Sequence, residues 1–153
     1  MDAIRIIPYE DRYRDDMIFM ILAAKDALGR VPTLNPDLLD VPGHYLRRGG
    51  GFFLAVDGGG RVVGSAGFSR IDGTDGAFVH RLYVKPSLKW RGVGSALLAA
   101  VERGMRGKGV RVSWVHLGEP REQWFESYAF YPKHGYLECK PRYMKKDLDG
   151  TSG

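Results

Sequence analysis

Three strand-like runs in succession, separated by glycine-rich turns, constrain the fold of this chain most. The first two, Phe52–Val56 and Val62–Phe68, flank Asp57-Gly58-Gly59-Gly60, a typical hairpin turn. The third run, Phe78–Val84, follows a second turn of the same kind. The pattern predicts an antiparallel meander. In its last strand, alternate side chains are expected on one face: Phe78, His80, Leu82 and Val84.

Further elements are expected on both sides of the meander. A short strand at Ile4–Ile7 precedes a helix from Glu10, whose apolar residues recur at spacings of three and four. A second helix is expected to begin with Asn35 as its N-cap and to run unevenly to Arg48. After the meander the predicted elements are a helix over Ser95–Arg106, a strand over Val110–Leu117, a helix beginning near Pro120, a short strand at Tyr136–Glu138 and a last strand over Arg142–Leu148.

No linker or internal repeat divides these elements, and 153 residues suit one domain. The sequence therefore predicts a mixed α/β (α+β) domain over residues 1–148, with one sheet, helices on both faces and a polar tail at 149–153. The single cysteine, Cys139, cannot form an internal disulfide, which favours a packed core and a cytoplasmic location. The longest apolar run, Met17–Ala24, is far too short to span a membrane, and the N-terminus has no secretory leader, so no membrane partner is expected.

The net charge of +5 suits an anionic partner, whether a nucleic acid, a nucleotide or a phosphorylated cofactor. Lysines and arginines are spread along the chain rather than gathered on one helix, so we expect no nucleic-acid binding. The four histidines and the cysteine show no metal-ligand spacing, so no metal site is expected.

The strongest chemical signal lies where the third meander strand leads through a loop into a helix. Gly92 and Gly94 leave backbone N–H groups uncovered at the expected helix N-terminus, where the helix dipole favours an anion. Lys89 and Arg91 add positive charge beside them. The glycines would also fit a plain tight turn. A dinucleotide fingerprint fails because Leu97 occupies the third glycine position, and no P-loop sequence is present.

This run resembles motif A of the GNAT superfamily of N-acetyltransferases, whose signature is Arg/Gln-x-x-Gly-x-Gly/Ala. The resemblance rests on Val84, Pro86, Lys89, Arg91, Gly92, Val93, Gly94, Ser95, Leu97 and Leu98, with Lys89 in place of the usual first Arg or Gln. Downstream, Ala129–Tyr136 resembles the second signature of the superfamily, a helix tyrosine followed by glycine and an aromatic residue. The resemblance covers Phe52–Leu148; the preceding residues match only in layout.

The resemblance implies a mostly antiparallel sheet that splays between its fourth and fifth strands, with acetyl-CoA bound in the gap. The pyrophosphate is then expected beside Lys89 on the amides of Arg91, Gly92, Val93, Gly94 and Ser95. The pantetheine arm is expected along the backbone of Leu82, Tyr83 and Val84, where one amide would polarise the thioester carbonyl.

The resemblance also implies catalytic residues. Tyr131 matches the general acid of the family; its alternative is a core aromatic residue, which better describes Tyr128. Pro132 is expected to break the helix directly after Tyr131. His80 is a candidate general base, and its alternative is a buried core histidine. Further candidate bases are His116 and Glu119, and Gln123 could replace an asparagine that many members use to contact the cofactor.

The predicted function is therefore an N-acetyltransferase that moves an acetyl group from acetyl-CoA to a primary amine by direct attack in a ternary complex. The alternative is a non-catalytic acetyl-CoA-binding sensor or interaction module of the same fold. The acceptor amine, a small molecule or a peptide, is expected to contact the region Tyr13–Arg48, and the protein is expected to be a monomer or a homodimer. Four carboxylates in this region could attract a cationic amine, or they could simply form an ordinary solvated surface. They are Asp15, Asp16, Asp37 and Asp40.

Overall fold

The computed structural model describes residues 3–89, 91–118 and 124–148. The expected helix start near Pro120, the candidates Glu119 and Gln123, and the tail at 149–153 lie outside the described residues.

One seven-stranded sheet, in the order β1-β2-β3-β4-β5-β7-β6, forms the centre of the molecule. All neighbouring strands are antiparallel except β4 and β5, which confirms the predicted mostly antiparallel sheet. The strands are β1 (Arg5–Pro8), β2 (Gly51–Val56), β3 (Val62–Arg70), β4 (Gly76–Val84), β5 (Val112–His116), β6 (Leu137–Lys140) and β7 (Tyr143–Asp147).

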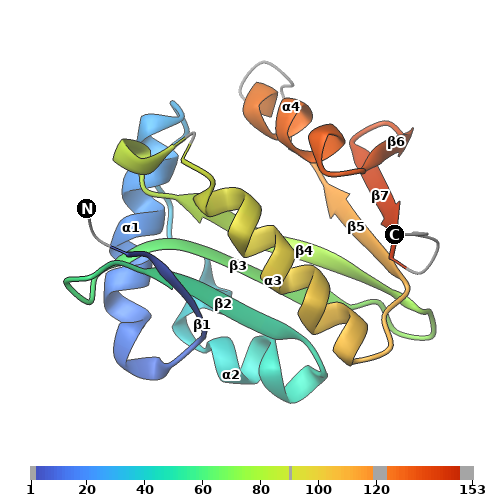
Figure 1. Ribbon diagram of the computed structural model, residues 1–153, viewed down its shortest axis with the longest axis horizontal. Coiled ribbons are helices and arrows are strands. Elements are labelled where there is room, and N and C mark those ends of the chain that lie inside the picture. The colour runs from blue at the N-terminus through green and yellow to red at the C-terminus, as the bar shows by residue number, and fades with distance from the viewer. Residues whose placement is uncertain (1–2, 90, 119–123, 149–153) are drawn as a thin grey trace.

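The parallel pair is joined at one end only. Gly76–Phe78 of β4 pair with Val112–Trp114 of β5, and beyond these residues the two strands separate (Figure 1). The predicted splay between the fourth and fifth strands is thus confirmed. It leaves the backbone of β4 from Val79 onward without a strand on its β5 side.

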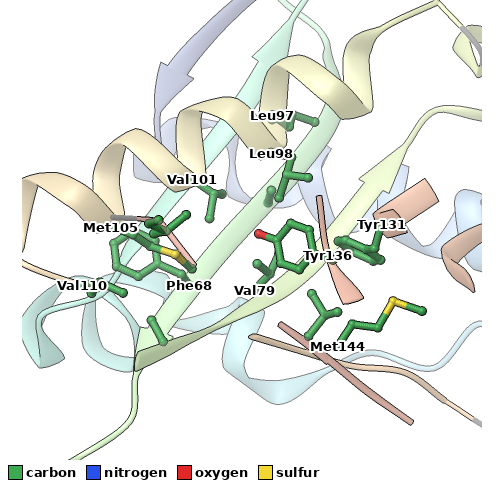
Figure 2. Close-up of a cluster of buried hydrophobic side chains, with 14 of the residues drawn as sticks. Phe68, Val79, Leu97, Leu98, Val101, Met105, Val110, Tyr131, Tyr136 and Met144 are labelled. Atoms are coloured by element: carbon green, nitrogen blue, oxygen red, sulfur yellow. The ribbon is translucent and has the colours of Figure 1, made fainter. Parts of the chain in front are cut away.

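Helices cover both faces of the sheet and define two cores. The helices α1 (Arg14–Ala27) and α2 (Val41–His44) pack on one face, in a core around Met17, Ile21 and Phe52. The helix α3 (Val93–Gly107) packs on the other face through Leu97, Leu98, Val101 and Met105. Tyr131 of α4 (Phe125–Lys133), Tyr136 and Met144 join this second core, as Figure 2 shows.

A buried polar network fixes the C-terminal strands against α3. The Tyr136 hydroxyl donates to Glu102 Oε2 at 3.0 Å and shares a hydrogen bond of 2.6 Å with Ser113 Oγ. Lys146 Nζ donates to the other oxygen, Glu102 Oε1, at 3.0 Å. The buried carboxylate on α3 therefore binds both Lys146 of β7 and Tyr136 directly, and Tyr136 links it to Ser113 of β5.

The predicted helix from Pro36 to Arg48 is three short pieces instead. They are 3-10 helices at Pro36–Leu39 and Leu46–Arg48, with the single turn α2 between them. Asn35 precedes the first piece but its side chain caps nothing; its Oδ1 accepts from Lys25 Nζ at 2.5 Å. The long-range contact to α1 has replaced the local cap.

Candidate active site

A cavity of about 450 Å³ lies between β4 and β5, where the strands separate. Most of the residues predicted to bind the cofactor or act in catalysis line it: His80, Leu82, Tyr83, Val84, Lys89, Gly92, Gly94, Ser95 and Tyr131. Of the two other predicted cofactor residues, Val93 is buried in the α3-side core and Arg91 is exposed.

The N-terminus of α3 opens at one end of this cavity. Gly92 is the N-cap in the left-handed conformation (φ 83°), and no side chain caps the helix. A Cβ added at Gly92 would meet nothing within 4 Å, so the backbone angle rather than lack of space favours glycine. With their N–H groups uncapped, the first residues of α3 can bind an anionic group.

Lys89 is held across the cavity in this structure. Its Nζ lies 2.8 Å from both carboxylate oxygens of Glu126, in the first turn of α4, and both residues line the cavity. A second contact lies between neighbouring segments: Oγ of Ser95, in the first turn of α3, lies 2.9 Å from Nε2 of His134, the residue that follows α4. The loop before α3 and the helix α4 are therefore tied together over the gap between the strands.

β4 contains a bulge at Arg81. Ser65 of β3 faces Tyr83 and Gly67 faces His80, so Arg81 and Leu82 together oppose a single residue of β3. Arg81 has φ 55°, a left-handed conformation that costs about 1 kcal/mol for a residue with a side chain.

The bulge reverses the alternation of side chains along β4. Leu82 and Val84 pack against the α3-side core with Val79, whereas Tyr83 packs against the α1-side core. His80 contacts Tyr45 of the α1-side core, at 5.9 Å between ring centroids. The prediction that His80 and Leu82 share a face was wrong. The bulge inserts one extra residue into β4 after His80, which places the two side chains on opposite faces.

The bulge also orients a backbone amide. Ser65 Oγ donates to the carbonyl oxygen of Arg81 at 2.7 Å. The C=O of a trans peptide and the N–H that follows it point in opposite directions, so the Leu82 N–H points away from Ser65 and β3. The cavity lies on that side of β4.

His80 lies on the opposite face of β4 from Leu82 and still lines the cavity. Its Nε2 is 2.7 Å from Ser69 Oγ. Burial, assisted by the positive charge of Arg81, lowers the pKa of His80 to about 4. The ring is therefore neutral at neutral pH.

Tyr131 occupies the last turn of α4 and is buried, with its ring edge-on to Phe130 and Tyr136. Burial raises the pKa of its hydroxyl above the ordinary tyrosine value, so the group keeps its proton. α4 continues through Pro132 to Lys133, and the expected break directly after Tyr131 was wrong. Tyr128 packs against the α3-side core.

Two further residues that line the cavity, Arg30 and Trp124, were not expected from the sequence. The Arg30 guanidinium carbon lies 3.6 Å from the ring centroid of Trp124, and both residues line the cavity. Arg30 follows α1 and Trp124 precedes α4, so the contact joins segments far apart in the sequence, and no local pattern signals it. His116, a candidate base, also lines the cavity and stacks on Tyr143 at 4.5 Å.

The four carboxylates singled out in the N-terminal region have partners in the structure. The contacts are Asp15 with Arg14, Asp16 with Arg61 and with the amide of Val62, Asp37 with Arg81, and Asp40 with the amide of Gly43.

Comparison with known families decides what this architecture is. The model of the acetyltransferase (GNAT) family matches residues 16–136, most of the chain. The chain belongs to the GNAT family. No curated protein sequence matches it.

Solved structures share the GNAT fold at low identity. A GNAT-family acetyltransferase from Staphylococcus aureus Mu50 is 23% identical with a TM-score of 0.85, covering 95% of this chain and 99% of the other. An acetyltransferase from Streptococcus agalactiae 2603 is 19% identical with a TM-score of 0.81, covering 94% and 98%. PaiA N-acetyltransferase from Thermoplasma acidophilum, solved in complex with coenzyme A, is 18% identical with a TM-score of 0.71, covering 95% and 99%.

The residues present fit the coenzyme that the family implies. An uncapped helix N-terminus lies at one end of the cavity, and the strand backbone beside it lacks a neighbour. Within the described ranges, no three His, Cys, Asp or Glu side chains gather so as to hold a metal ion. Nor does any helix in those ranges have the length and apolarity needed to cross a membrane.

Proposed function

We propose that this GNAT protein transfers an acetyl group from acetyl-CoA to a primary amine by direct attack in a ternary complex. The observation that carries the proposal is that one cavity connects the uncapped N-terminus of α3 with Tyr131 and His80. An anion site and two proton-transfer groups are thus arranged along the single gap between β4 and β5.

The cofactor would lie along β4. The amides of Arg91, Gly92, Val93, Gly94 and Ser95 hold the pyrophosphate, with Lys89 beside them. The backbone of Leu82, Tyr83 and Val84 binds the pantetheine arm on the side where β5 has diverged. The Leu82 N–H, which points to this side, donates a hydrogen bond to the thioester carbonyl oxygen.

Bound acetyl-CoA supplies a thioester, whose carbonyl carbon bonds to the amine nitrogen while its C–S bond breaks. Tyr131 donates its proton to the departing sulfur, a role that fits a hydroxyl kept protonated by burial. His80 accepts the proton that the amine nitrogen loses. Because its pKa is only about 4, His80 is a weak base, and we expect it to contribute less than Tyr131 does.

The acceptor amine, a small molecule or a peptide, would bind in this cavity near His80; Arg30 and Trp124 also line the cavity. The tyrosine in the cavity favours an enzyme over an acetyl-CoA-binding sensor module. A protein that binds acetyl-CoA but acetylates no member of a broad amine library would instead fit the sensor.

Calorimetric titration with acetyl-CoA tests the cofactor site, and α3 supplies a matched pair of variants. A Cβ at Gly94 would lie 3.5 Å from the Phe130 ring, so Gly94→Leu places its side chain at the cavity wall. Gly107, at the other end of the same helix, has open space around its Cβ position. We expect saturable one-to-one binding that Gly94→Leu weakens at least about 10-fold and Gly107→Leu leaves unchanged. Absence of binding to the unaltered protein would refute the proposal.

A further inference from the structure

The strained residue of β4 is held by side chains from two directions. Arg81 donates from Nε and Nη2 to the two oxygens of Asp37, at 3.1 and 3.0 Å. Its carbonyl oxygen accepts from Ser65 Oγ at 2.7 Å. A left-handed arginine persists only where its surroundings fix it, and these contacts provide that constraint.

Asp37 is itself anchored. It lies in the 3-10 helix Pro36–Leu39, and the Tyr45 hydroxyl donates to its Oδ2 at 2.5 Å. The Tyr45 ring packs edge-on against Phe52 in the α1-side core. Burial opposes ionisation of Asp37, but the hydrogen bonds from Arg81 and Tyr45 prevail and lower its pKa. A charged acceptor therefore faces the guanidinium.

We propose that Asp37 is a positioning residue of the acetyl-transfer site. With Ser65, it fixes the Arg81–Leu82 peptide so that the Leu82 N–H points at the thioester carbonyl oxygen. The inference rests on the proposed function, because it needs acetyl-CoA in this cavity. It also gives a function to the segment after α1, which is expected to contact the acceptor amine. Through Asp37, this segment would position the backbone amide that polarises the acetyl group.

The thioester carbonyl gives this role a direct readout. CoA lacks the carbonyl, so its affinity reports the phosphate and pantetheine contacts alone, whereas acetyl-CoA affinity includes the hydrogen bond from Leu82. In Asp37→Asn we expect the ratio of acetyl-CoA affinity to CoA affinity to fall about 3- to 10-fold. With acetyl-CoA labelled with ¹³C at the carbonyl, the infrared carbonyl band of the bound ligand should move back toward its position in water.

A matched control exists in Asp16, which also binds an arginine through two nitrogens, Arg61 Nε and Nη2. Asp16→Asn removes the same charge and the same kind of ion pair, but it lies away from the bulge. We expect it to leave both the affinity ratio and the carbonyl band unchanged. Two milder variants guard against misfolding of Asp37→Asn: Tyr45→Phe and Ser65→Ala each remove one hydroxyl contact and should shift the band in the same direction.

The outcomes separate the two proposals. If the unaltered protein binds neither CoA nor acetyl-CoA, the proposed function fails. If it binds both, and Asp37→Asn matches Asp16→Asn in ratio and band, the positioning role of Asp37 is wrong while the function stands. If Asp37→Asn does not fold, an unshifted band in both Tyr45→Phe and Ser65→Ala overturns the inference.

Discussion

At the scale of single residues, two neighbouring tyrosines have different surroundings. The rings of Tyr131 and Tyr136 meet edge-on at 5.4 Å, and both are buried. The Tyr136 hydroxyl is bonded to Ser113 and Glu102, whereas Tyr131 lines the cavity. The same change, loss of one hydroxyl, should therefore have opposite consequences at the two positions.

We expect Tyr131→Phe to lower kcat by about 100-fold or more, because the departing sulfur loses its proton donor, while stability and CoA affinity are kept. Tyr136→Phe should instead lower the free energy of unfolding by about 1–3 kcal/mol, because it removes a hydrogen-bond partner from a buried carboxylate and a buried serine. Steady-state kinetics and urea unfolding of both variants provide the measurements. Equal losses of kcat in the two would argue against Tyr131 as the acid.

At the scale of elements, the ion pair between Lys89 and Glu126 joins the β4–α3 loop to α4 over the cavity. The family resemblance assigned Lys89 to the cofactor phosphates. The structure adds that a carboxylate already binds this ammonium. Cofactor phosphates and Glu126 would thus compete for one cation.

Glu126→Gln should release Lys89 and tighten CoA binding about 3- to 10-fold, with a steeper dependence on salt. Titrations at low and high ionic strength measure both effects. Glu138→Gln, on the exposed strand β6, makes the same charge change away from the cavity and should alter neither. Weaker binding in Glu126→Gln would mean that the ion pair holds the site open for the cofactor.

Some elements could be predicted from the sequence and others could not. Strands, the helix α3 and the glycine turn before it follow from local periodicity and glycine placement, and the structure has them. The pieces between Pro36 and Arg48 and the bulge at Arg81 were missed, because side-chain contacts distant in sequence fix them: Lys25 with Asn35 and Asp37 with Arg81. For the same reason the contacts of Lys89 and Arg30 across the cavity could not be predicted.

At the scale of the whole molecule, burial of His80 couples the candidate active site to the stability of the fold. Its pKa falls from 6.5 to about 4 on folding, so below pH 6.5 the unfolded chain takes up a proton that the folded protein refuses. Stability is full above this range and declines as pH falls toward 4, by at most about 3 kcal/mol from this residue. His134, whose pKa is also lowered, contributes in the same direction.

His80→Gln should flatten this decline. Urea unfolding at about pH 7 and at about pH 4.5 gives the loss of unfolding free energy in both proteins. Only the difference between the two losses is assigned to His80. The unaltered protein should lose more stability than the variant across the interval. Parallel losses would show that His80 titrates normally and is accessible to water.

The separation of β4 and β5 also determines the order in which the two walls of the cavity form during synthesis. One wall of the cavity comes from residues 24–95 and the other from residues 115–134. As a growing chain leaves the ribosome, the meander, the bulge and α3 can pair and pack while the second wall does not yet exist. A nascent chain that ends after α3 carries the glycine turn before α3 and the oriented Leu82 amide but neither Tyr131 nor an enclosed cavity. Under the proposed function, the affinity for coenzyme therefore arises late in synthesis, when the last strands pair with β5.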